Sequence, residues 1–419
     1  MQKQSFIYIF DENNYMLISF KFKNFLSYKN EVQLLMSSVK AFKELRQTNT
    51  FIKKDFELLK TAAIYGSNGG GKSNFIKAMG YMNKLIHNSF ADSLKKPEDR
   101  FDYNLQFKLN NVSEKSPIEM EVVFIKNDII YRYGFHVNNN IIIKEWLFQK
   151  KEVETRLFER DLNDFKINNN SFSEGNKYKN NINDNVLFLS YLAQNNAKLS
   201  SEIFEWFYGI NATNALSNTN YEKITKSLLK EDSNFKIWLS YAVKFLSISN
   251  VELDNENNIL TYHNKFDNND FIIDSIPFNL DYDESEGTIK LIYLLGAIYH
   301  TLIHNEILFI DELDSKLHPN LTRKIITFFH QFNNSSQFIF TLHDSNLLDK
   351  KVFRRDQVWF VDKNKFGSSE LYSLSEFDSS VVRSTSDYRK KYLDLTFGAA
   401  DSIDISEQLI DLLYDKVKS

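Results

Sequence analysis

The sequence of 419 residues has no cysteine, and it holds only 12 glycines and 4 prolines. The absence of cysteine excludes disulfides, thiolate metal sites and cysteine nucleophiles. No apolar run approaches the roughly 18 residues that a membrane-spanning helix needs. The first 14 residues carry acidic and amide side chains where a signal peptide would keep an apolar core. We therefore expect a cytoplasmic protein with no membrane partner.

An excess of charge of one sign is absent too, because 51 basic side chains are set against 55 acidic ones, giving a formal net charge of −4. This balance excludes a whole-chain basic field for nucleic acid but leaves room for a local patch. Hydrophobic residues at 42% and charged residues at 25% are ordinary for a globular protein. The length allows one large domain or two ordinary ones.

Because glycine is scarce, its one dense cluster is informative. The segment GSNGGGKS (residues 66–73) matches the phosphate-loop pattern GxxxxGK[ST] in full. An apolar run at 58–65 predicts a buried strand before it, and helical spacing follows it, which is the context this motif requires. In such a loop, backbone amides surround phosphate oxygens, the lysine contacts the β- and γ-phosphates, and the serine binds Mg²⁺. The predicted ATP-binding residues here are Gly66, Ser67, Asn68, Gly69, Gly70, Gly71, Lys72, Ser73 and Asn74.

A second motif, EILFIDELDSKLHP, spans residues 306–319. Its four apolar residues at 307–310 predict a strand buried on both faces, which ends in Asp311 and Glu312. Ligands of open α/β sheets bind at the carboxyl ends of strands. We expect Asp311 to hold Mg²⁺ through water and Glu312 to act as the general base on the attacking water.

The third motif, ESEGTIKL (residues 284–291), opens an apolar helix, and a strand ending in Thr-Leu-His follows the acidic strand. The order of these motifs resembles the ABC-like ATPases of the SMC and RecF class. More narrowly, LFIDELDSKLHP, FTLHDSNLLD and FRRDQVWFVDKN with GSSELYSLSEF resemble the RloA-type bacterial AAA-family ATPases, which are often encoded beside phage-defence effectors.

The resemblance implies roles for further residues. Ser285 and Gly287 take the place of the ABC signature, which contacts the γ-phosphate bound by the other subunit. From the residues alone, Ser285 could equally be an ordinary helix cap. Asp314 takes the D-loop position at the dimer interface, and His343 resembles the switch histidine. For the magnesium-sensing glutamine the choice lies between Gln194, which we prefer, and Gln106.

The expected fold class is α/β: an ABC-type P-loop ATPase core with a mixed or parallel sheet, an antiparallel β-subdomain and a helical insertion. Residues 1–150 form the first part of the core, 151–275 a loop and the helical insertion, and 276–419 the rest of the core. Within these parts we expect a helical stretch between the strands at 16–25 and 58–65, and an antiparallel meander at 118–148. A surface loop at about 161–185, a strand-like run at 186–194, helices at 197–250 and two short strands come next.

The expected function is Mg²⁺-dependent ATP hydrolysis in a homodimer or higher oligomer that closes two nucleotides between subunits. Such an ATPase would gate an effector encoded nearby, a nuclease or TOPRIM-like protein, in anti-phage defence. The alternative is a RecF-like DNA-binding ATPase. Intrinsic nuclease activity is disfavoured, because the acids at 401–406 read better as a cap of a final helix. The candidate DNA contacts are Lys150, Lys151, Arg354, Arg355, Arg389, Lys390 and Lys391.

Overall fold

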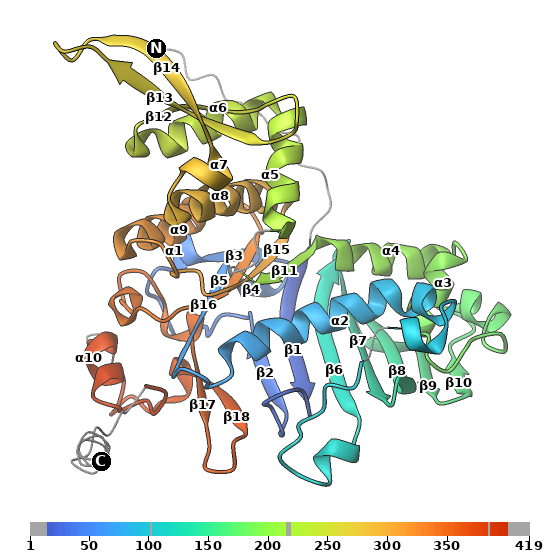
Figure 1. The fold of residues 1–419 in the computed structure, drawn as a ribbon. Coiled ribbons are helices and arrows are strands. Elements are labelled where there is room, and N and C mark those ends of the chain that lie inside the picture. Colours follow the sequence, from blue (N-terminus) through green and yellow to red (C-terminus); the bar gives the residue numbers. More distant parts are fainter. Residues whose placement is uncertain (1–14, 101–102, 215–218, 384–385, 401–419) are drawn as a thin grey trace, which may run out of the picture.

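The computed structural model describes residues 15–100, 103–214, 219–383 and 386–400 (Figure 1). In these ranges the strands form sheets of seven, six, three and two members. No helix in them is both long enough and apolar enough to cross a lipid bilayer. The final helix expected near the end of the chain, the acids at 401–406 and the first 14 residues lie outside the described ranges.

The central sheet has six strands in the order β11-β15-β16-β5-β17-β18. All neighbours are parallel except β18, which is antiparallel to β17. Its strands are β11 (Ile210–Asn214), β15 (Ile307–Asp311), β16 (Gln337–Thr341), β5 (Thr61–Gly66), β17 (Val358–Lys363) and β18 (Ser369–Ser373). Strands β5, β15 and β16 are buried along their whole length, as parallel strands covered on both faces should be.

The two faces of this sheet belong to two different hydrophobic cores. Along β15, Ile307 and Phe309 join one core, whereas Leu308 and Ile310 join the other. The first core also holds the apolar face of α2 (Lys72–Ser93), which crosses the molecule in front of the seven-stranded sheet (Figure 1). The second core is covered by α8 (Glu286–His304) and α9 (Pro319–Gln331). The central sheet therefore lies between the two hydrophobic cores and joins them.

The seven-stranded sheet is antiparallel throughout, in the order β10-β9-β8-β7-β6-β1-β2. Its strands are β1 (Met16–Lys23), β2 (Val32–Leu35), β6 (Ile118–Lys126), β7 (Ile129–Asn138), β8 (Ile141–Lys150), β9 (Glu154–Asp161) and β10 (Asp164–Ile167). The meander expected at 118–148 is confirmed as β6, β7 and β8. Helices α3 (Phe188–Gln194) and α4 (Lys198–Trp206) pack beside α2.

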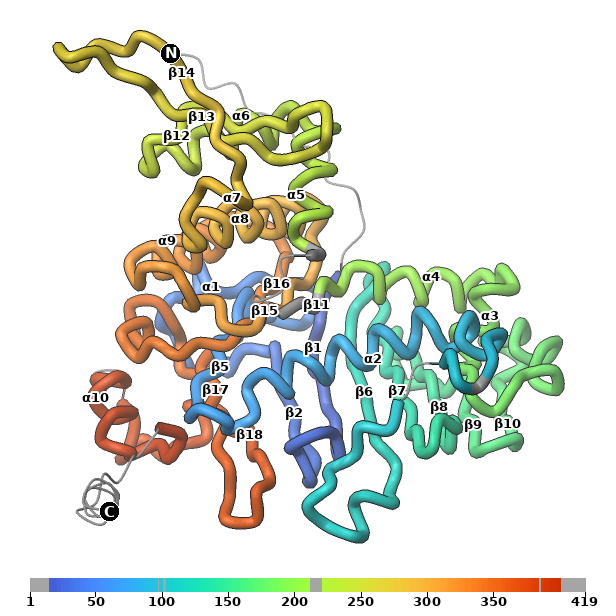
Figure 2. Tube along the Cα trace, viewed as in Figure 1, coloured from blue at the N-terminus to red at the C-terminus, as the bar shows by residue number. Residues whose placement is uncertain are grey.

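A helical region with a small sheet follows β11. It consists of α5 (Thr219–Glu231), α6 (Ser233–Val243), β12 (Ile248–Leu253), β13 (Ile259–Phe266), β14 (Ile272–Asn279) and α7 (Leu280–Asp283). The tube in Figure 2 shows the β13–β14 hairpin projecting away from the rest of the molecule. Three antiparallel strands stand where two were expected, because β14 doubles back along β13. The chain then enters α8.

Several expected elements are confirmed. Helix α8 covers the predicted apolar stretch. Helix α9 begins after His318, whose side chain caps the helix by accepting the amide of Asn320 at 3.2 Å, with Pro319 in the first turn. Strands β17 and β18 form an antiparallel hairpin, which is followed by the short helix α10 (Tyr388–Leu393). Together with the parallel sheet, the antiparallel subdomain and the helical region, these elements confirm the α/β fold class.

Other expectations are wrong. The stretch between β1 and β5 is not mostly helical: besides β2 it holds the short strands β3 (Thr50–Lys53) and β4 (Phe56–Leu59) and only four helical residues, α1 (Arg46–Asn49). The run expected as one strand at 58–65 breaks at Lys60, whose buried ammonium donates to the carbonyls of His330 and Phe332, both at 2.8 Å. Strand β10 lies in the expected loop, and β11 lies within the region expected to be helical.

The run expected as a strand at 186–194 contains helix α3. The carboxylate of Glu145, on β8, accepts the amides of Phe188 at 2.6 Å and Leu189 at 3.0 Å, and so caps the helix from a distant part of the chain. A cap supplied 43 residues away leaves no signal in the local sequence.

Candidate functional site

The sequence motifs meet at one edge of the central sheet. Strand β16 lies between β5 and β15, and all three run parallel. The ends of β5 and β15 are therefore two strand spacings apart, about 9.6 Å. The glycine loop begins at the end of β5, Asp311 ends β15 and Glu312 follows it, and His343 comes two residues after β16. This edge is the candidate site.

The glycine loop, residues 66–71, requires its glycines for steric reasons. A Cβ atom on Gly66 would lie 2.2 Å from the carbonyl oxygen of Val361 on β17. One on Gly71 would lie 2.3 Å from Oγ of Ser369, and Gly71 has a φ of 123°, which side chains disfavour. Gly69 has a φ of 72° but faces open space. The loop is thus held against its own chain on one side and left open on the other.

Two serines that the sequence did not single out support the loop from behind. Oγ of Ser369 donates to the carbonyl of Gly70 at 2.5 Å, and it lies 2.7 Å from Oγ of Ser27, whose hydroxyl can donate to it. Asn74 donates to the same Ser27 hydroxyl at 2.9 Å, and the hydroxyl of Tyr28 donates to the carbonyl of Gly71 at 3.1 Å. Segments more than 300 residues apart thus fix the loop. Only the fold brings them together.

The loop leads into a helix whose first turn suits an anion. Gly71, at the N-cap of α2, has no side chain to cap the helix, and the first turn has no acidic residue. The amide groups of this turn and the positive end of the helix dipole are therefore directed at the loop opening. Lys72 is 5% exposed, and its ammonium donates to the carbonyls of Gly66 at 2.6 Å and Ser67 at 3.0 Å. This cradle fits a triphosphate.

The two acids at the end of β15 have different environments. Asp311 is buried, and its Oδ1 accepts the hydroxyl of Thr341 at 2.7 Å. The same hydroxyl accepts the amide of Glu312 at 2.6 Å, and Glu312 has a φ of 52°. Thr341, on β16, thus orients both residues. Asp311 and Ser73 provide the oxygen ligands that Mg²⁺ prefers, while the Glu312 side chain remains 27% exposed.

His343 and Asp314 lie beside Glu312. Nε2 of His343 is 3.8 Å from Oε1 of Glu312. Oδ2 of Asp314 accepts the backbone amides of His343 at 2.8 Å and Asp344 at 2.6 Å. Asp314 therefore holds the segment that carries the histidine. The structure brings Glu312, Asp314 and His343 together, as the motif order predicts.

Ser285 caps α8: its Oγ accepts the amide of Thr288 at 3.2 Å. A Cβ on Gly287 would lie 2.9 Å from the carbonyl of Lys316. Both residues line a groove of about 450 Å³ together with Lys316 and His318. The cap is thus observed, and the contact with a second copy remains a prediction.

Lys290, one turn into α8, links this helix to the acidic strand. Its buried ammonium donates to the carbonyls of Glu312 and Ser315, both at 2.7 Å. Burial lowers the pKa of Lys290 to about 8, against the opposing effect of nearby Asp314 and Glu312. No local sequence signal marks this link, because a lysine in an amphipathic helix is ordinarily solvated.

Gln194 does not reach the site, so the preference for it as a metal-sensing residue is wrong. It ends α3, and Ser190 of that helix donates to the carbonyl of Ile86 at 2.6 Å, about 21 Å along α2 from Lys72. Figure 1 shows α3 beside the end of α2 that is remote from the loop. Gln106 is buried and donates to Asn138 of β7 at 3.1 Å. On the other side of β15, Asn214 of β11 is paired in register with Asp311.

Two of the basic positions considered for DNA, Arg354 and Arg355, make contacts within the chain. Arg354 is fully buried and donates to Asp356 at 2.8 Å and 2.9 Å. Arg355 is paired with Glu44 at 3.1 Å and covers the ring of Phe42 at 3.8 Å. Neither guanidinium is available for a phosphate contact in this arrangement, which removes the two arginines of that set nearest each other in sequence.

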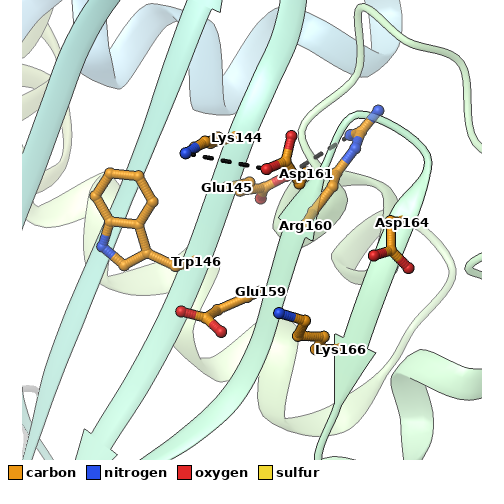
Figure 3. Close-up of a pocket in the computed structure, with 8 residues that line it drawn as sticks. All are labelled: Lys144, Glu145, Trp146, Glu159, Arg160, Asp161, Asp164 and Lys166. Atoms are coloured by element: carbon orange, nitrogen blue, oxygen red, sulfur yellow. Dashed lines mark ion pairs between the residues drawn. The ribbon is translucent and has the colours of Figure 1, made fainter.

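A separate concavity of about 510 Å³ lies on β8, β9 and β10 of the seven-stranded sheet, whereas the glycine loop follows β5 of the central sheet. Figure 3 shows Lys144 directed at Asp161, and Arg160 paired with Glu145. These distances are 3.9 Å and 3.8 Å, and the second pair is fully buried. Seven of the eight lining residues are charged, and several pair with one another. We assign this surface a structural role, because Glu145 caps α3.

Comparison with solved structures finds similarity to SMC heads. For the SMC head domain from Thermotoga maritima, identity is 15%, coverage is 85% of this chain and 98% of that chain, and the TM-score is 0.43. For an SMC head bound to the C-terminal winged-helix domain of ScpA, identity is 13%, coverage is 88% of this chain and 100% of that chain, and the TM-score is 0.42. A third structure is an SMC head with an extended coiled coil, bound to the C-terminal domain of ScpA derived from Pyrococcus furiosus. Here identity is 12%, coverage is 85% of this chain and 96% of that chain, and the TM-score is 0.40.

No curated protein sequence matches the chain at a significant level. A family profile does match it: residues 62–349 fit the family described as "AAA domain, putative AbiEii toxin, Type IV TA system". The match spans the glycine loop, the acidic strand and the His343 segment, and it covers more than half of the 419 residues. The chain therefore belongs to this family of AAA-type ATPase domains.

Proposed function

We propose that the protein is a Mg²⁺-dependent ATPase that closes two ATP molecules between two copies of the chain. One observation carries the proposal: a sterically fixed phosphate loop and a buried aspartate followed by a partly exposed glutamate share one edge of the central sheet. ATP is the ligand that such a loop and acid pair accommodate. Membership of an ATPase-domain family supports the same conclusion.

The residues divide the work of hydrolysis by their geometry. Amides of the loop and the Lys72 ammonium would bind the phosphates. Ser73 and Asp311 would hold Mg²⁺, which would supply positive charge to neutralise the charge that develops on the phosphates. Glu312 accepts a proton from the attacking water, and His343, 3.8 Å from that carboxylate, contacts the same region. Thr341 and Asp314 position these groups through their hydrogen bonds.

The second copy completes the site through Ser285 and Gly287. These residues line a groove at the start of α8, where helix amides favour an anion. Lys290 ties that helix to the Glu312–Ser315 backbone of its own chain. When the start of α8 binds the nucleotide of the other copy, this link would therefore transmit the movement to the general base of its own chain. ATP then stabilises the closed pair, and hydrolysis releases it.

We propose further that this cycle controls a protein effector in anti-phage defence, of the kind encoded beside RloA-type ATPases. The family description names a toxin of a toxin–antitoxin system, which supports a defence role. A RecF-like role in DNA binding has less support, since Arg354 and Arg355 make contacts within the chain.

The test is Glu312→Gln. The variant is expected to bind Mg-ATP, to hydrolyse it about 10²–10⁴-fold more slowly than the parent, and to accumulate as an ATP-bound dimer in sedimentation velocity. Lys72→Ala is expected to stay monomeric with ATP. Unchanged turnover in Glu312→Gln would show that the general base is assigned wrongly.

Glu119 offers a matched control. Its side chain is 28% exposed and lies 3.6 Å from Nε2 of His136, against 27% and 3.8 Å for Glu312 and His343. It lies on β6 of the other sheet. Glu119→Gln should therefore turn over ATP at the parental rate and show no ATP-trapped dimer.

A further inference from the structure

Three side chains of metal-ligating type meet where α8 ends and β15 begins. They are His300, His304 and Glu306, called here the His–His–Glu cluster. One ligand atom of each lies within 4.8 Å of the ligand atoms of the other two. Within the described residues no other such group of three is found. The nucleotide site uses none of them.

The arrangement suits one ion. His300 and His304 are four residues apart on a helix, so both imidazoles project from one face, the spacing found in helical zinc motifs. Their ring centroids are 4.2 Å apart, and Nδ1 of His300 is 2.9 Å from Oε2 of Glu306. Ligands of a tetrahedral zinc ion with bonds near 2.0–2.1 Å lie about 3.4 Å from one another. Adjustments of about an ångström would therefore bring all three onto one ion.

The surrounding hydrogen bonds are those of a supported metal site. Nδ1 of His304 lies 2.9 Å from the carbonyl of His300, an acceptor that fixes the proton on Nδ1 and leaves the lone pair on Nε2. Asn211 of β11 donates to Oε2 of Glu306 at 2.7 Å. Metal-bound histidines and carboxylates are typically oriented by such outer partners.

The electrostatic setting favours a cation. The C-terminal end of α8 carries the negative end of the helix dipole. Both histidines line a cavity of about 740 Å³, which offers an entry path. Glu231 and Asp232 line the same cavity, and Lys223 is the lysine on its wall. Asp232 already caps α6, which leaves Glu231 or water for a fourth position.

We propose that the His–His–Glu cluster binds one divalent transition-metal ion, with Zn²⁺ the best fit to two imidazoles and one carboxylate. The ion would tie the end of α8 to β15 and, through Asn211, to β11. It is distinct from the Mg²⁺ of the nucleotide site, because Mg²⁺ takes oxygen ligands. Helix α8 has 19 residues, so Ser285 lies about 28 Å from the cluster.

The test uses tag-free full-length protein, stripped with a chelator, incubated with Zn²⁺ and dialysed. Metal analysis is expected to give one Zn²⁺ per chain, and Co²⁺ substitution should give the intense visible bands of a tetrahedral site. In His300→Gln/His304→Gln the Zn²⁺ affinity should fall by at least about tenfold. Zn²⁺ at a hundredfold excess over Kd should raise the Tm of the parent by about 3 °C and leave the Tm of the double variant unchanged.

His136→Gln is the matched control, because His136 also faces a glutamate, Glu119, but has no second histidine. It should bind Zn²⁺ like the parent. His304 is exposed, so the single variant His304→Gln tests the site even where the double variant folds poorly. Equal Zn²⁺ content and affinity in the parent and in both cluster variants would overturn the proposal, as would the absence of Zn²⁺ from the dialysed parent.

Discussion

The two regions that we propose to contact phosphate, the glycine loop and the Ser285–Gly287 segment, differ in how the chain supports them. The glycine loop is enclosed by its own subunit: β17 lies against Gly66, and Ser27 and Ser369 lie against Gly71. The Ser285–Gly287 segment rests on the loop after β15 and otherwise borders an open groove, with the Glu286 side chain 76% exposed. One region is complete within the chain. The other has an open side, which is where we place the second copy.

The largest effect should come from filling the enclosed region. In Gly71→Ala, the new Cβ would press on Ser369 at 2.3 Å, and the φ of 123° would be strained. We expect ATP affinity to fall about 100-fold, or about 2.7 kcal/mol, in isothermal titration with Mg-ATP. Gly69→Ala, with a φ of 72° and nothing within 4 Å, should lose much less. Equal losses would contradict the steric account of the loop.

The open region should behave in the opposite way. Ser285→Asp keeps a good N-cap residue for α8 but places a negative charge where a γ-phosphate is expected. Stability and ATP affinity of the single chain should hold, while steady-state ATPase activity should fall about tenfold. If ATP affinity of the single chain fell together with activity, Ser285 would instead contact the nucleotide bound by its own chain.

The link between the two regions should carry a pH dependence. The pKa of Lys290 is lowered from 10.5 to about 8 by burial. Between these values the unfolded chain binds more protons than the folded one, so stability rises with pH across that window, and below pH 8 the burial cost is constant. Lys290→Met should show a smaller rise than the parent, as measured by urea unfolding at pH 7.5 and 9.5, because the buried Lys60, whose pKa is also lowered to about 8, still contributes. An equal rise in the stability of the parent and of Lys290→Met between these pH values would refute the contribution of Lys290.

The smallest effect is expected behind the loop. Ser369→Ala removes the hydrogen bonds to Gly70 and Ser27 but adds no bulk. A loss of about 1 kcal/mol corresponds to roughly fivefold weaker ATP binding. A loss as large as that of Gly71→Ala would mean that the hydrogen bonds, rather than the space around the glycine, determine the loop conformation.

The same contrast separates what the sequence predicts from what it cannot. Residues 66–73 and Asp311–Glu312 lie where expected, because strand, loop and helix signals are contiguous in the chain. Ser27 and Ser369 escape notice because they meet across 342 residues. The Gln194 hypothesis depended on a strand-like run at 186–194, which is in fact helix α3. The sequence could not show this, because the cap of α3 comes from Glu145, on another element. Strand β11 is polar and short, so no apolar pattern marks it.

The most direct test of the two-copy site is a mixing experiment with Lys72→Ala and Ser285→Asp. Lys72→Ala alone should be nearly inactive, and Ser285→Asp alone should be about tenfold below the parent. Lys72→Ala does not dimerise by itself, but it can pair with a Ser285→Asp chain that holds ATP, and this mixed dimer has one intact composite site. With random pairing, activity in an equimolar mixture should recover to about a quarter of the parental value. Activity in the mixture no higher than in the separate variants would contradict a site shared between two copies.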